Sequence, residues 1–320
     1  MSSSLHTAQE LLNTVMRWQS EPDQATQDLL PAGLEAHLEQ LKDLPLGMAY
    51  VDDEREELVV GLAGERDRED AGRALRALLG DVPLRLSSVQ VTRDDAPAKK
   101  EDCRPIWGGV RMNSGATIAV VYKLSDGPLG TILSSHAVGE GTGQTVGQAA
   151  ITSAYGKVTI NPSLKSRYSD SALAVITNTR IGGEPNKIWA APNTAYTVND
   201  YAISSNTPLR LVIYMQGAQT PELQRGVIWQ KGVTIKDARG VLYDQVLATY
   251  SAQSGDSGAP IFYMTEYPGY VVFVGLHAGR IIEDETTYAY YSTWEAIRAE
   301  LKLPQYKGAE VSAPSAQSVK

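Results

Sequence analysis

The feature that most constrains the fold of this chain is a long series of short β-prone segments. Between residues 117 and 291, runs rich in Val, Ile, Thr and Tyr are bounded by Gly, Asn, Asp or Pro. Short strands separated by turn residues, without alternating crossover helices, favour a β-sandwich or a closed β-barrel. The predicted strands are residues 117–122, 131–133, 157–160, 172–176, 210–214, 227–234, 241–247, 259–263, 270–276 and 287–291.

The first hundred residues follow a different pattern, in which helical and strand periodicities are mixed. A charged stretch at residues 93–102 has little to bury, and we predict it to be a linker. The chain is therefore predicted to have an α+β domain at residues 1–98, a β-rich domain at residues 99–305 and a flexible tail at residues 306–320. The other predicted elements are helical segments around 11–16 and 34–41, strands at 46–51, 58–62 and 84–91, and helices at 69–79 and 294–301.

Composition and charge exclude several functional classes. The formal net charge is −8, whereas a phosphate-binding surface needs clustered Lys and Arg, so nucleic acid is not expected as a ligand. No signal peptide is evident, and no run of about 18 apolar residues predicts a membrane span. The single cysteine, Cys103, can form no intramolecular disulfide, which fits a reducing compartment. We therefore expect a cytoplasmic protein without membrane association.

A serine nucleophile is indicated in the segment from Ser254 to Gly258. A serine hydroxyl is a weak nucleophile, and it must be displayed on a tight turn beside a general base. Gly255 and Gly258 allow the backbone angles of such a turn. The main-chain N–H groups of Gly255 and Ser257 would then point at one place and form an oxyanion hole.

Residues 255–260 resemble the Gly-Asp-Ser-Gly-X-Pro signature of the chymotrypsin-like serine peptidases. The chain also contains the family's other two motifs in the family's order. His136 follows a short apolar strand, as in Leu-Thr-Ala-Ala-His, and Asp170 begins a segment similar to Asp-X-Ala-Leu. The resemblance implies two antiparallel six-stranded β-barrels, preceded here by the small α+β domain. It also implies that His136 is the base, Asp170 orients it and Ser257 is the nucleophile.

An α/β-hydrolase arrangement fits the sequence less well. That fold uses the order Ser, Asp, His and the motif Gly-X-Ser-X-Gly. Here Ala259 follows Gly258, and His277 is the only histidine downstream of Ser257. The chymotrypsin-like interpretation is therefore preferred.

The stretch around His277 resembles the Gly-Ile-His-X-Gly-Gly segment of glutamyl endopeptidases. This resemblance implies that His277 binds an acidic or amide substrate side chain, with Arg280 adding charge. Ser251, at the base of the pocket, and Ser254 complete the predicted substrate-binding set. Two departures from the family pattern are Ala252, where Thr or Ser is usual, and Arg280, where Gly is usual. The alternative is that His277 is a structural residue of its strand.

The predicted function is that of a serine endopeptidase that acts on proteins or peptides through an acyl-enzyme and needs no metal or organic cofactor. Residues 1–98 are interpreted as a regulatory or docking domain for a protein partner. Residues 104–110 resemble the Ile-Val-Gly-Gly start of mature chymotrypsin-like domains, but we expect an uncleaved chain. A removable inhibitory pro-region is one alternative. Another is a latent or inactive protease-fold effector or binding protein controlled through its N-terminal domain.

Overall fold

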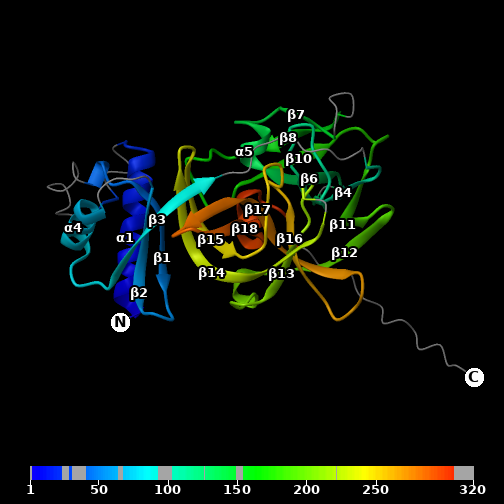
Figure 1. The fold of residues 1–320 in the computed structure, drawn as a ribbon. Coiled ribbons are helices and arrows are strands. Elements are labelled where there is room, and N and C mark those ends of the chain that lie inside the picture. Colours follow the sequence, from blue (N-terminus) through cyan, green and yellow to red (C-terminus); the bar gives the residue numbers. More distant parts are fainter. Residues whose placement is uncertain are drawn as a thin grey trace, which may run out of the picture.

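Two β-sheets form most of the computed structural model (Figure 1). The structure describes residues 2–23, 29–30, 41–63, 68–92, 103–125, 127–148, 154–220 and 222–305. The predicted linker at residues 93–102, the tail at residues 306–320 and most of the predicted helical segment at 34–41 lie outside these residues. Among the described helices, none has both the length and the apolar character needed to cross a bilayer.

The smaller sheet has five strands in the order β5-β6-β10-β8-β7. Several of its β-branched and aromatic residues, among them Val121 and Tyr155, are fully buried in one hydrophobic core. β6 and β10 pair in antiparallel register, with Ser134 opposite Ser171. The residues that follow β6 therefore lie beside those that precede β10. The strands are β5 (Ile118–Lys123), β6 (Leu129–Ser134), β7 (Thr145–Gly147), β8 (Ala154–Ile160) and β10 (Ser171–Ile176).

The larger sheet has thirteen strands and contains both the C-terminal half of the chain and the N-terminal strands. Its strands from the C-terminal half are β13 (Val212–Met215), β14 (Gln224–Asp237), β15 (Gly240–Ala248), β16 (Pro260–Met264), β17 (Tyr270–Glu283) and β18 (Thr286–Thr293). The remaining strands before them are β1 (Leu46–Asp52), β2 (Glu57–Ala63), β3 (Leu84–Thr92), β4 (Ile106–Gly108), β9 (Ser166–Arg167), β11 (Gly183–Ala191) and β12 (Thr194–Tyr201).

The predicted strands are all present, and the structure adds the short strands β4, β7 and β9, the hairpin of β11 and β12 and an extension of β17. The hairpin of β11 and β12 was not predicted, because most of its residues are half-buried and polar and show no clear apolar alternation. β17 extends to Glu283, well beyond the predicted end at residue 276. Its second half contains Gly, His and Arg and has weak strand propensity, but it pairs with both β18 and β3.

Helices cover the N-terminal strands and the C-terminal end of the chain. α1 (Ser2–Ser20) packs its apolar face, including Leu12 and Met16, against β1 and β2 in one core. α4 (Arg68–Leu79) joins β2 to β3, as its Ala and Leu spacing predicts. α6 (Trp294–Glu300) is capped by Thr293, whose side chain accepts a hydrogen bond from the N–H of Ala296. Two short helices, α5 (Ser135–Val138) and η3 (Ser204–Asn206), complete the described set.

The N-terminal strands do not form a separate sheet. β1 pairs with β14, and β3 pairs with the C-terminal half of β17, so the sheet runs from the α+β unit into the rest of the molecule (Figure 1). A hydrophobic cluster spans the same junction and includes Tyr50 and Val89 from one side and Leu247 and Tyr290 from the other. The two parts are therefore packed as one body at this junction.

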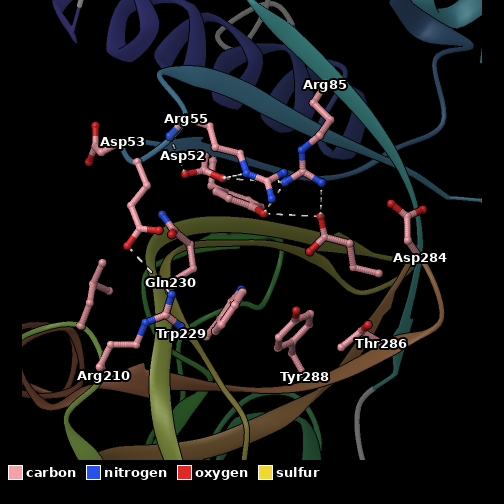
Figure 2. A pocket seen from close by; sticks show the side chains of 14 residues that line it. Asp52, Asp53, Arg55, Arg85, Arg210, Trp229, Gln230, Asp284, Thr286 and Tyr288 are labelled. Atoms are coloured by element: carbon pink, nitrogen blue, oxygen red, sulfur yellow. Dashed lines mark hydrogen bonds and ion pairs between the residues drawn. The ribbon is translucent and has the colours of Figure 1, made fainter.

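An ion cluster centred on Arg85 also spans the junction. Arg85 of β3 donates through Nε to Glu57 at 2.8 Å, and its guanidinium lies 3.6 Å from Glu283 of β17. Burial raises the pKa of Glu283, while Arg85 opposes that rise. Figure 2 shows Arg85 across a cavity of about 310 Å³ from Trp229 and Tyr288, whose rings stack with centroids 5.7 Å apart. Charged and aromatic groups from both parts of the chain thus line one hollow.

Candidate active site

The turn that bears Ser257 depends on two glycines. Gly255 has φ of +100° and Gly258 has φ of +87°, a region that residues with a Cβ rarely adopt. A Cβ on Gly258 would lie 2.2 Å from the carbonyl oxygen of Thr117. The main chain of the turn is tied to both sheets, since the N–H of Thr117 donates to the Ser257 carbonyl and the N–H of Gly258 donates to the His277 carbonyl. The serine is therefore placed at the contact between the two sheets.

The structure brings together the three residues that the sequence motifs single out. His136 Nε2 lies 2.9 Å from Ser257 Oγ. On the opposite side of the ring, His136 Nδ1 is hydrogen-bonded to Asp170 Oδ2, and the main-chain N–H of His136 donates to Asp170 Oδ1 at 3.0 Å. The side chains of His136 and Asp170 are fully buried. This geometry lets the imidazole accept a proton from the hydroxyl while the carboxylate faces the other nitrogen.

The fold explains why His136 meets Asp170. His136 lies in the one-turn helix α5 directly after β6, and Asp170 directly precedes β10. Because β6 and β10 are paired at Ser134 and Ser171, the two residues lie at the same end of the sheet. Local pairing within the smaller sheet therefore makes this half of the site.

Two further serines surround Asp170, and sequence reasoning did not identify them. The Ser134 hydroxyl donates to Asp170 Oδ2 at 3.0 Å and lies 2.8 Å from His136 Nδ1. The N–H of Asp170 donates to Ser292 Oγ at 2.9 Å, and Ser292 in turn donates to Gln245. The only sequence signal for Ser134 was its position two residues before His136.

The predicted oxyanion donors lie on the same turn. Within the part of the chain that the structure describes, the Gly255 N–H has no hydrogen-bond acceptor. The Gly255 carbonyl, in contrast, accepts a hydrogen bond from the Thr117 hydroxyl at 2.9 Å, which fixes the orientation of the next peptide unit. The turn can therefore offer a main-chain donor to an incoming carbonyl oxygen.

The predicted specificity residues occupy different environments. His277 is fully buried in β17, and its Nδ1 lies 3.0 Å from the hydroxyl of Tyr250. Arg280 is half-buried in the same strand, opposite Thr92 of β3. Ser251 is exposed and Ser254 is half-buried in the loop before the nucleophile. Tyr250 is a partner of His277 that the motif comparison did not identify.

A cavity of about 810 Å³ borders the histidine of this site. Ser135 and His136 line it, together with the loop at residues 161–165 and the turn between β14 and β15. The end of helix α1 forms another part of the wall, where Gln19 accepts a hydrogen bond from Lys236 Nζ at 2.5 Å. Burial lowers the pKa of Lys236 to about 8. The volume is in the range of small-molecule and peptide side-chain sites.

Comparisons with known proteins give a match only at the level of structure. No protein-family model matches the chain, and no curated protein matches it. A solved glutamic acid specific serine protease, described as using a histidine triad in substrate binding, matches with a TM-score of 0.50 and 17% identity over 63% of this chain and 100% of that chain. This likeness establishes a shared fold.

Two other solved bacterial proteases give similar values. Thermobifida fusca Protease A matches with a TM-score of 0.48 and 19% identity over 62% of this chain and 96% of that chain. Nocardiopsis protease matches with a TM-score of 0.49 and 16% identity over 62% of this chain and 97% of that chain.

The crowding around Gly258 generates a stability prediction with a matched control. Gly143 has nearly the same positive φ, +90°, but a Cβ there would meet no atom within 4 Å. Gly143→Ala should therefore cost only the left-handed backbone penalty, about 1–2 kcal/mol. Gly258→Ala should cost about 1–3 kcal/mol more, because the methyl group meets the Thr117 carbonyl. Denaturant titration of both variants measures the difference, and equal losses would contradict the geometry of the turn.

Proposed function

We propose that this chain, which has the chymotrypsin-like fold, is a serine endopeptidase. The observation that best supports the proposal is the hydrogen-bonded series from Ser257 Oγ through His136 to Asp170. Acyl transfer by a serine hydroxyl uses a histidine that contacts the serine and a carboxylate that contacts the histidine, and this site has both contacts. A protein or peptide is the expected substrate class.

The proposed reaction uses the atoms of this site in sequence. Ser257 Oγ attacks the carbonyl carbon of the scissile bond while its proton passes to His136 Nε2. Asp170 stabilises the imidazolium, and the N–H groups of Gly255 and Ser257 donate to the oxyanion. His136 then gives its proton to the leaving amine. A water molecule, deprotonated by His136, releases the acyl group and restores the hydroxyl.

Labelling with a fluorophosphonate probe tests whether Ser257 is activated. The wild-type chain should be labelled, and Ser257→Ala should abolish labelling. Asp170→Asn should slow labelling by about 10⁴-fold, since the wrong imidazole tautomer then faces the serine. The control is Asp284→Asn, at a carboxylate that is about half exposed and lies beside Arg68 rather than the histidine. An unlabelled wild-type chain would favour the latent effector or binding protein instead.

The proposal extends to a preference for Glu, Gln or Asp before the scissile bond. The main chain of His277 is hydrogen-bonded to Gly258 and Ala259, so this residue lies beside the turn that carries Ser257. If the Tyr250 hydroxyl donates to Nδ1, the proton of His277 resides on Nε2, and that N–H can donate to a substrate carboxylate. The solved protease with glutamic acid specificity uses a histidine triad in substrate binding, whereas one hydrogen-bond partner of His277 here is Tyr250.

A mixed peptide library tests this specificity. Wild-type protein should cleave after Glu or a similar residue, and His277→Ala should lose that preference while fluorophosphonate labelling of Ser257 persists. Tyr250→Phe, which removes only the hydroxyl, should weaken the preference because it no longer sets the tautomer of His277. Selective cleavage by the wild type after Lys, Arg or large apolar residues would reject the proposal.

We further propose that residues 1–98 restrict access to the site. Strand edges are common docking places for extended peptides. Here β3 already occupies an edge of β17, with Thr92 opposite Arg280, three residues beyond His277. Ser257 is itself fully buried, and the end of helix α1 forms part of the wall of the cavity beside His136. A protein partner that draws β3 away would therefore open the site.

Proline substitutions in β3 test this control in the full chain. Adjacent residues of an antiparallel pair alternate in hydrogen bonding, so Gln90→Pro and Val91→Pro should affect the pairing with β17 unequally, and at least one should break it. That variant should hydrolyse peptides several-fold faster than the wild type. Gln90→Ala and Val91→Ala keep the N–H groups and should leave the rate unchanged. If neither proline variant is faster, the N-terminal strands do not limit access.

A further inference from the structure

Asp256, the residue before the proposed nucleophile, is buried and is surrounded by uncharged donors. Its Oδ1 accepts hydrogen bonds from the N–H groups of Gln219 at 2.9 Å and Thr220 at 3.0 Å. Its Oδ2 accepts from the N–H of Gln253 at 2.9 Å and from the Thr220 hydroxyl. Within the described residues Asp256 forms no ion pair, and its side chain is fully buried. A carboxylate in this position is stabilised by hydrogen bonds rather than by a cation.

The loop that supplies these donors fits closely around the carboxylate. A Cβ on Gly217 would lie 2.0 Å from Asp256 Oδ1 and 2.4 Å from its Cγ, so only glycine allows the approach. The loop is held from its other side, because the N–H of Ala218 donates to the Thr117 hydroxyl at 3.0 Å. Thr220 is itself buried. The positions of the loop and of the carboxylate are therefore mutually determined.

The same carboxylate also affects the geometry of the turn at residues 254–258, which carries Ser257. Asp256 stands between the two predicted oxyanion donors, Gly255 and Ser257, and the Thr117 hydroxyl accepts from the loop while it donates to the Gly255 carbonyl. A shift of the Asp256 side chain would rotate the peptide units on both sides of it. One of these peptide units carries the Gly255 carbonyl and the other carries the Ser257 N–H, so contacts that Thr220 makes with Asp256 act on the backbone next to both predicted donors.

The segment around Ile106, which resembles a mature N-terminus, does not contact this carboxylate. Ile106 is fully buried inside strand β4, which pairs with β11, and its N–H lies 3.4 Å from the Gly182 carbonyl. Every hydrogen bond described for the Asp256 carboxylate comes from residues 219, 220 and 253. The carboxylate therefore already has hydrogen-bond donors in the uncleaved chain.

We propose that Thr220 is a positioning residue that holds Asp256, and through it the oxyanion donors, in the reactive arrangement without cleavage of the chain. The inference rests on the proposed serine-peptidase function. Thr220 does not touch the substrate in this proposal. It acts through Asp256, and its hydroxyl and main-chain N–H provide two of the four hydrogen bonds on that carboxylate.

The test compares Thr220→Val, which removes the hydroxyl at nearly constant volume, with Thr220→Ser, which retains it. The readout is fluorophosphonate labelling of Ser257, with the rate at saturating probe separated from the probe concentration at half-saturation. Thr220→Val should lower the saturating rate by about tenfold, less than the 10²–10³-fold loss when an oxyanion donor is deleted. The half-saturating concentration should stay within about twofold, and Thr220→Ser should restore the rate.

The matched control is Thr207→Val, at a buried threonine whose hydroxyl donates to the Ser204 carbonyl at 2.9 Å instead of to a carboxylate. This variant should keep the wild-type labelling rate. If Thr220→Val does not fold, Thr220→Ala takes its place, because alanine puts no additional methyl group beside the carboxylate. The control for that variant is Thr207→Ala. The same slowing of the saturating rate is expected.

Two results would overturn the inference. One is an unchanged saturating rate in the folded Thr220 variants, with wild-type labelling intact. The other is mass spectrometry showing that only chains cleaved between Pro105 and Ile106 are labelled. Wild-type protein that is not labelled at all would instead count against the proposed peptidase function, so the two failures are distinguishable.

Discussion

The contact on which this structure depends is the hydrogen bond between Ser257 and His136, because it joins residues from two different sheets. His136 is placed by the pairing of β6 with β10, whereas Ser257 is placed by a turn of the larger sheet. Thr117, directly before β5, binds the Ser257 carbonyl through its N–H and so connects the two sheets next to the reactive atoms. A shift of one sheet relative to the other would separate His136 from Ser257.

Two buried carboxylates flank that hydrogen bond, and an ionised carboxylate out of water is costly unless donors surround it. Asp170 faces the His136 ring and the Ser134 hydroxyl, and Asp256 faces Thr220 and main-chain N–H groups. Each carboxylate therefore fixes the geometry of its surroundings, because a missing donor would leave a charge unsatisfied. In our proposal, Asp170 orients the base and Asp256 orients the turn that carries Ser257.

The N-terminal strands are structurally continuous with the part of the molecule that contains the site. They continue the larger sheet through β14 and β17 and share a hydrophobic cluster with it. The Arg85 ion cluster adds polar contacts across the same junction. β3 pairs with β17, the strand that contains His277. The packing of the N-terminal strands is therefore coupled to the surroundings of Ser257. In our proposal, the control of access follows from this shared sheet.

The sequence by itself determined the mainly β fold and most of the strands, because β propensity and glycine-dependent turns are local properties of neighbouring residues. Its motifs also singled out the three residues that meet at the site. The tertiary structure alone decided the pairing of β3 with β17 and the contacts of Ser134, Tyr250 and Thr220. Those contacts join residues distant in the chain, or use ordinary Ser, Thr and Tyr side chains that have no distinctive pattern. Whether such a hydroxyl becomes a partner of a buried charge depends on register and packing between strands, which no local pattern contains.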